Sequence, residues 1–138
     1  MIKTSTRTIG TFKVMIYDKI QSVLNKTKDK LLKSGFINVI TQCVQNESIA
    51  SILKDNPQVI ITDHRLADGL DALLFVEAVR QYSSIPIIIW GNRMPDKTEN
   101  DILALKRVYT LRSKDGLFSL TEILERMNQM NRNPKQWS

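Results

Sequence analysis

One short segment constrains the fold of this chain more than any other. Residues 59–62 form an apolar, β-branched run that stops at Asp63, crosses a loop containing an Asp-Gly dipeptide, and restarts as an amphipathic helix near Asp71. This pattern predicts a buried parallel strand followed by a crossover helix. We therefore expect Asp63 at the carboxyl end of a central strand, the edge of an open α/β sheet where ligands bind.

Strand and helix alternate along the rest of the chain in the same way. Five such units predict an α/β fold with three layers, a doubly wound five-stranded parallel sheet with helices on both faces. Residues 11–130 form the predicted domain, and residues 1–10 and 131–138 are expected to be flexible tails. The predicted strands are 12–17, 36–41, 59–62, 85–90 and 107–111, and the predicted helices are 20–34, 46–54, 71–82, 98–106 and one beginning at residue 119.

Local signals set the helix boundaries. The first helix has an apolar stripe that includes Ile20 and Val23, and Gly35 supplies its stop. Asn46 is the expected cap of the second helix. At the last helix, a Ser followed three residues later by a Glu matches a capping box, so we expect this helix to begin at Ser119.

Charge is distributed unevenly. Residues 1–34 hold eight Lys and Arg against two acids, residues 35–105 hold five against nine, and residues 106–138 hold seven against three. The first and last helices of a doubly wound sheet lie on one side, so we expect a basic face there. It would bind an acidic protein or a nucleic-acid backbone, or simply keep the domain soluble. Its expected contributors are Lys26, Lys30, Lys33, Arg126 and Arg132.

Composition excludes several other classes of protein. Cys43 is the single cysteine, which rules out a disulfide framework and fits a reducing compartment. We see no signal peptide and no apolar stretch long enough for a membrane span, so a cytoplasmic protein without membrane contact is expected. Glycine-rich phosphate loops and nucleophile-elbow motifs are missing from the sequence, and we do not expect an enzyme.

Residues 63–73 read Asp-His-Arg-Leu-Ala-Asp-Gly-Leu-Asp-Ala-Leu. They resemble the pattern D-x-R-L-P-D-G-x-D-G-L of response-regulator receiver domains, which serve bacterial two-component signalling. The resemblance covers residues 11–130 and implies a flavodoxin-like fold with strand order 2-1-3-4-5. In that order Asp18 and Asp63 face each other across one pocket.

The resemblance also implies a chemistry for this pocket. In a working receiver the strand-three aspartate is phosphorylated while acids hold Mg²⁺ beside it. Asp63 takes the phosphoacceptor position. The metal positions fall on Asp18, Asp63 and the backbone carbonyl of Arg65.

The receiver lysine that binds the phosphate has two candidate matches in this chain. Alignment through Tyr109, the aromatic switch position, places it at Arg112. Alignment through the Lys-Asp dipeptide places it at Lys114. We prefer Arg112, because Tyr109 then stays in the fifth strand.

Two residues depart from the receiver pattern. Tyr17 stands where receivers carry a second acid, so we expect no cofactor or only weakly bound Mg²⁺. Trp90, followed by Gly91, stands where receivers carry a hydroxyl beside the phosphate. An indole offers a single N–H donor on a large rigid ring and cannot replace that hydroxyl.

Three functions remain open. The first is a pseudo-receiver, a phosphorylation-independent protein-interaction module that docks through its last two strands and helices, with a histidine kinase or a regulator as partner. The second is an active single-domain response regulator, phosphorylated on Asp63 by a histidine kinase within a phosphorelay. The third is a basic nucleic-acid-associated α/β module. Tyr17 and Trp90 favour the first, and we expect a monomer or a weak dimer.

Overall fold

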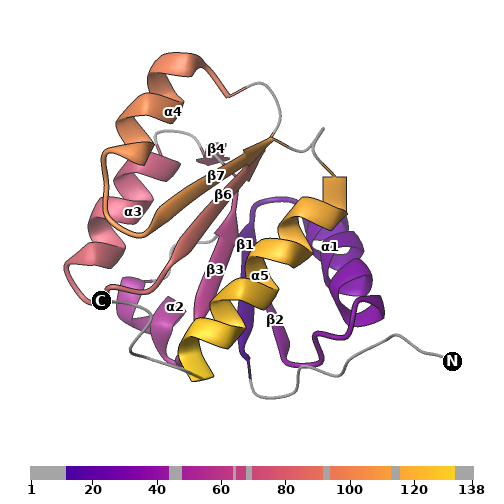
Figure 1. The fold of residues 1–138 in the computed structure, drawn as a ribbon. Coiled ribbons are helices and arrows are strands. Elements are labelled where there is room, and N and C mark those ends of the chain that lie inside the picture. Colours follow the sequence, from indigo (N-terminus) through magenta and orange to yellow (C-terminus); the bar gives the residue numbers. More distant parts are fainter. Residues whose placement is uncertain are drawn as a thin grey trace, which may run out of the picture.

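A computed structural model describes residues 12–43, 48–63, 65–67, 70–91, 94–112 and 116–132. Its centre is a five-stranded parallel sheet between two layers of helices (Figure 1). The strand order is β2-β1-β3-β6-β7, which confirms the predicted flavodoxin-like order 2-1-3-4-5. The strands are β1 (Val14–Asp18), β2 (Val39–Cys43), β3 (Val59–Thr62), β6 (Ile87–Gly91) and β7 (Val108–Arg112).

The helices divide between the two faces of the sheet. One face carries α1 (Gln21–Lys33) and α5 (Gly116–Arg132). The other carries α2 (Ile49–Leu53), α3 (Ala72–Arg80) and α4 (Asp96–Leu103) (Figure 1). The predicted placement of the first and last helices on one side is therefore confirmed. None of the helices in the described ranges is long and apolar enough to cross a membrane.

Alternation along the strands builds two separate cores. Successive side chains of a strand point to opposite faces. In β3, Val59 and Ile61 therefore join the core under α1 and α5, and Ile60 joins the core under α2, α3 and α4. All four residues of β3 are buried. A strand that is apolar on both faces is stable only between two helical layers, which is why this run of sequence determines the architecture.

The loop after β3 contains an element that the sequence did not predict. Residues of β4 (Arg65–Ala67) and β5 (Leu70–Asp71) pair as a small antiparallel ribbon. An Asp-Gly dipeptide between two short extended segments favours a hairpin turn. That dipeptide itself lies outside the described residues, as does His64.

Some predicted helix boundaries were wrong. The last helix already begins at Gly116, so Ser119 lies inside its first turn and is not the cap. The second helix begins after Ser48, whose Oγ accepts a hydrogen bond of 3.2 Å from the backbone N–H of Ser51. The predicted cap, Asn46, lies outside the described residues.

The first helix begins one residue later than predicted, and its buried stripe is correspondingly shorter. Ile20 and Val23 were predicted to be buried but are exposed, at 46% and 38%. Leu24, Thr27 and Leu31, the other members of the predicted stripe, are buried against the sheet as expected. Gly35 has φ of 102°, which confirms its predicted role in stopping the helix.

Arg80, the last residue of α3, fixes the turn that leads into β7. Its Nη2 donates to the carbonyls of Lys106 (2.8 Å) and Arg107 (3.1 Å), and its Nε also donates to Lys106 (3.1 Å). Its Nη1 donates to the carbonyl of Ser83 at 3.3 Å. Arg107 has φ of 57°, a left-handed conformation that is costly for a residue with a Cβ. The guanidinium therefore stabilises a strained turn.

We expect Arg80→Ala to lower the free energy of unfolding by about 1–3 kcal/mol, because it removes charge-assisted hydrogen bonds to three carbonyls. Urea denaturation followed by circular dichroism measures this change. Lys26→Ala, on the exposed side of α1, is the control and should shift stability by less than about 0.5 kcal/mol. Equal effects of the two substitutions would contradict the role given to Arg80.

Candidate functional site

Two carboxylates meet at the carboxyl edge of the sheet. Asp18 ends β1 and Asp63 follows β3, and these two strands are direct neighbours in the sheet. Asp18 is buried, and its Oδ1 accepts a hydrogen bond of 3.1 Å from the backbone N–H of Ile20. Burial raises the pKa of Asp18, the Ile20 hydrogen bond opposes this, and the negative charge of Asp63 raises the pKa further. The structure thus brings the two acids close enough to repel each other.

The donor set at this edge fits a weakly held Mg²⁺. Asp18 and Asp63 supply two carboxylates, and Arg65, whose carbonyl is the predicted third ligand, begins β4 two residues after Asp63. No group of three or more His, Cys, Asp or Glu within the described ranges is arranged to hold a metal. Mg²⁺ is commonly bound through one or two carboxylates together with water and phosphate oxygens. A cation here would also relieve the repulsion between the two acids.

Tyr17, the residue before Asp18, packs in a core of the protein. Its side chain is buried at 2% exposure in the core under α3, where its ring stacks on Phe75 with centroids 5.0 Å apart and an interplanar angle of 16°. In a receiver this strand position supplies a carboxylate. In this chain the position holds an aromatic side chain that packs in the core.

Trp90 lies near the end of β6 on the face covered by α1 and α5. It is partly buried and packs against the core on that side, and its register partner on β7 is Leu111. The indole Nε1 is buried and has no hydrogen-bond partner in the part of the chain that the structure describes. An unpartnered buried donor costs about 1–3 kcal/mol, so packing of the ring must hold Trp90 in place. The ring packs against the core at the position that the resemblance assigns to a small hydroxyl.

The remaining predicted positions lie on β6 and β7. Tyr109 is paired with Ile88 one pleat below Trp90, so the two aromatic residues occupy neighbouring strands as expected. Gly91 ends β6 and is paired with Arg112, which ends β7. Arg112 therefore sits at the same edge of the sheet as Asp63. Lys114, the alternative match to the receiver lysine, lies outside the described residues.

The predicted basic residues do not all lie together. Lys26, Lys30 and Lys33 are exposed on α1, which packs over β1 and β2, and Lys33 contacts Asp29 at 3.9 Å. Arg126 lines a groove next to Tyr109 on β7, at the opposite edge of the sheet. Arg132 is the last residue of α5. The two helices share a face, but Lys26, Lys30 and Lys33 lie on the helix over β1 and β2, whereas Arg126 lies beside β7.

Sequence reasoning missed Thr62, the residue before Asp63. It is paired with Tyr17 on one side and Ile89 on the other, and its buried Oγ1 has no hydrogen-bond partner among the described residues. The only signal in the sequence was a hydroxyl at the end of an otherwise aliphatic strand. Thr62 adds a second unpaired polar atom near the acidic edge, on the opposite face from Trp90.

Comparison with solved structures identifies the fold. The chemotaxis protein CheY4 of Vibrio cholerae matches with a TM-score of 0.69 and 24% identity, over 83% of this chain and 97% of that protein. A two-component response regulator from Clostridium difficile gives 0.72 and 20%, over 86% and 97%. The receiver domain of nitrogen regulatory protein C gives 0.70 and 19%, over 88% and 97%. The chain therefore has the fold of a response-regulator receiver domain, which confirms the resemblance at the level of the fold. No protein-family model and no curated protein sequence matches it.

The raised pKa of Asp18 has a consequence for stability. The folded-state pKa lies above the unfolded value of 3.8, so the folded protein binds more protons than the unfolded chain between these two values. Stability should fall as pH rises through that window, and the penalty persists at pH 7. We expect Asp18→Asn, which keeps an acceptor for the Ile20 N–H, to raise the free energy of unfolding at pH 7.

Urea unfolding from pH 3 to pH 8 measures this effect. The gain over the wild type should vanish at a pH below 3.8, where both states of the wild type are protonated. Asp29→Asn, on the exposed surface of α1, is the control and should change the free energy of unfolding at pH 7 by less than about 0.5 kcal/mol. Destabilisation by Asp18→Asn at pH 7 would show that the Asp18 carboxylate is favourable as it stands.

Proposed function

We propose that this chain is a signalling module of the two-component type that acts through protein contacts and does not form a stable aspartyl phosphate. The observation that carries the proposal is the stacking of Tyr17 on Phe75 at the strand position where receivers hold an acid. Trp90 packs against the core where a hydroxyl is expected, and this also supports the proposal.

The reasoning follows from what phosphoryl transfer to a carboxylate requires. Two anions, the attacking carboxylate and the phosphoryl group, must approach each other, and a bound Mg²⁺ would supply the charge neutralisation. Asp18 and Asp63 are the residues that would hold that ion. Tyr17 contributes no carboxylate to it, and Trp90 offers no hydroxyl to a phosphate oxygen. Any phosphate on Asp63 would therefore be poorly stabilised.

The surface around β7 suits a docking face that is independent of phosphorylation. The Thr110 hydroxyl on β7 donates a hydrogen bond of 2.8 Å to Glu99 on α4, which ties the helix to the strand. Tyr109 and Leu103 expose apolar surface on these two elements. A histidine kinase or a regulator is the class of partner that fits a module with this fold.

An active response regulator is the second candidate. The juxtaposition of Asp18 and Asp63 favours it, because Mg²⁺ is commonly bound through one or two carboxylates and Asp63 is the expected phosphoacceptor. The two candidates differ in whether Asp63 becomes phosphorylated.

Incubation with acetyl phosphate and Mg²⁺, followed by intact-mass spectrometry, tests the proposal. We expect no stable adduct of one phosphate, because charge neutralisation at the site is incomplete. Asp63→Asn is the control for the position of any adduct. A phosphate adduct on the wild type that disappears in Asp63→Asn would establish the active regulator instead.

We expect Trp90→Thr to lower the free energy of unfolding by about 3 kcal/mol, because a partly buried indole is lost from the core. It should also increase binding of beryllofluoride with Mg²⁺, since the hydroxyl and the space for the anion are restored together. Trp90→Phe, which keeps the aromatic packing but adds no hydroxyl, is the matched control and should not gain binding. Urea denaturation and fluorine NMR measure the two effects. If Trp90→Thr changes neither stability nor binding, Trp90 does not occupy the hydroxyl position.

A further inference from the structure

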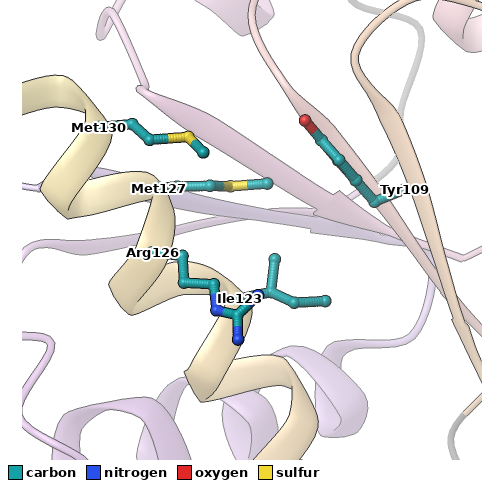
Figure 2. Close-up of a pocket in the computed structure, with 5 residues that line it drawn as sticks. All are labelled: Tyr109, Ile123, Arg126, Met127 and Met130. Atoms are coloured by element: carbon teal, nitrogen blue, oxygen red, sulfur yellow. The ribbon is translucent and has the colours of Figure 1, made fainter. Parts of the chain in front are cut away.

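A groove of about 250 Å³ runs between β7 and α5. Tyr109 lines it from the strand, and Ile123, Arg126, Met127 and Met130 line it from the helix. In Figure 2, the side chains of Ile123, Met127 and Met130 extend from α5 towards β7, and the ring of Tyr109 lies across from them. The receiver chemistry discussed above uses none of the helix residues.

The lining of this groove suits a flat aromatic group. Two methionine thioethers make favourable contacts with aromatic rings and adapt to irregular shapes. The ring of Tyr109 lines the groove on the side of β7. A second aromatic ring packed against it would be stabilised beyond the effect of its buried area. Arg126 adds a cation that can lie over an aromatic face. A tryptophan side chain uses each of these contacts.

The sequence places a tryptophan within reach. Helix α5 ends at Arg132, and Trp137 follows five residues later. Five residues span at most about 17 Å, and the helix rises about 8 Å from Met127 to Arg132, so the indole can reach the groove even if the chain between them reverses. Pro134 cannot continue a helix, and it disfavours helical backbone at the residue before it, so the chain can reverse here. A segment that turned back at this point would run along the groove.

We propose that the indole of Trp137 docks in the Tyr109 groove of its own chain. The contact covers apolar surface on Tyr109 that is otherwise 36% exposed. It also places this segment on the docking face around β7, so that a partner binding there must displace Trp137. The inference rests on the groove and the chain length, and does not depend on whether Asp63 is phosphorylated.

Methyl NMR of the full chain tests this proposal at low protein concentration. Trp137→Ala removes the ring current from the groove and should shift the methyl resonances of Met127, Met130 and Ile123. Gln136→Ala, in the same segment, is the matched control and should leave those resonances in place. Because the altered residues lie beyond α5, both variants should fold as the wild type does.

Fluorescence gives the reciprocal measurement. In a Trp90→Phe background Trp137 is the single tryptophan, and Met127→Gln should shift its emission to longer wavelength and increase its quenching by acrylamide. Leu74→Gln, at an exposed apolar position on α3, should change neither. Unmoved methyl resonances in Trp137→Ala would overturn the proposal. Shifts that grow with protein concentration would also overturn it, because they would assign the groove to the tryptophan of a second copy.

Discussion

The structure depends on the burial of β3 between two strands and two layers of helices. Every residue of β3 is buried, and its backbone pairs with β1 on one side and β6 on the other. A strand in this position cannot be displaced without opening both cores. It therefore holds the acidic edge rigidly, because Asp63 follows its last residue directly and Asp18 ends the neighbouring strand. The pairing of β1 with β3 therefore sets the relative positions of Asp18 and Asp63.

The acidic edge lowers the stability of the folded protein at neutral pH. Asp18 is buried beside Asp63, and the same region contains two buried polar atoms, Thr62 Oγ1 and Trp90 Nε1, that have no partner in the described part of the chain. Costs of this kind concentrate at sites that bind something, since a packing-only role would favour apolar residues. The pair of acids is therefore the feature of this edge that packing alone does not explain, whereas Tyr17 belongs to the core.

The sequence was most informative where one pattern had one physical solution. Strand β3 has the predicted bounds of 59–62, because an aliphatic run on both faces fits only a buried parallel strand. Prediction failed at α5, since the Ser119 and Glu122 spacing of a capping box also occurs inside a helix. It also missed β4 and β5, whose strands of three and two residues are too short to show a period.

At the site, the sequence showed where this chain departs from the receiver pattern, but not how Tyr17 and Trp90 pack. The absence of an acid at Tyr17 is visible in the sequence. The stacking of its ring on Phe75 is not, because it depends on the pairing of β1 with β3 and on the position of α3. The same holds for Trp90, whose face on the sheet follows from the register between β6 and β7.

The outer strands of the sheet differ in the charge that they carry. Within the described ranges, β2 and β7 are the edge strands. Lys106 and Arg107 precede β7 and Arg112 ends it, and cations at an edge discourage pairing with a second molecule. Strand β2, Val-Ile-Thr-Gln-Cys, carries no charge and has high β-propensity. When the fold is weakened, intermolecular β-pairing would therefore start at β2, and a charged substitution there would protect the chain in concentrated solution.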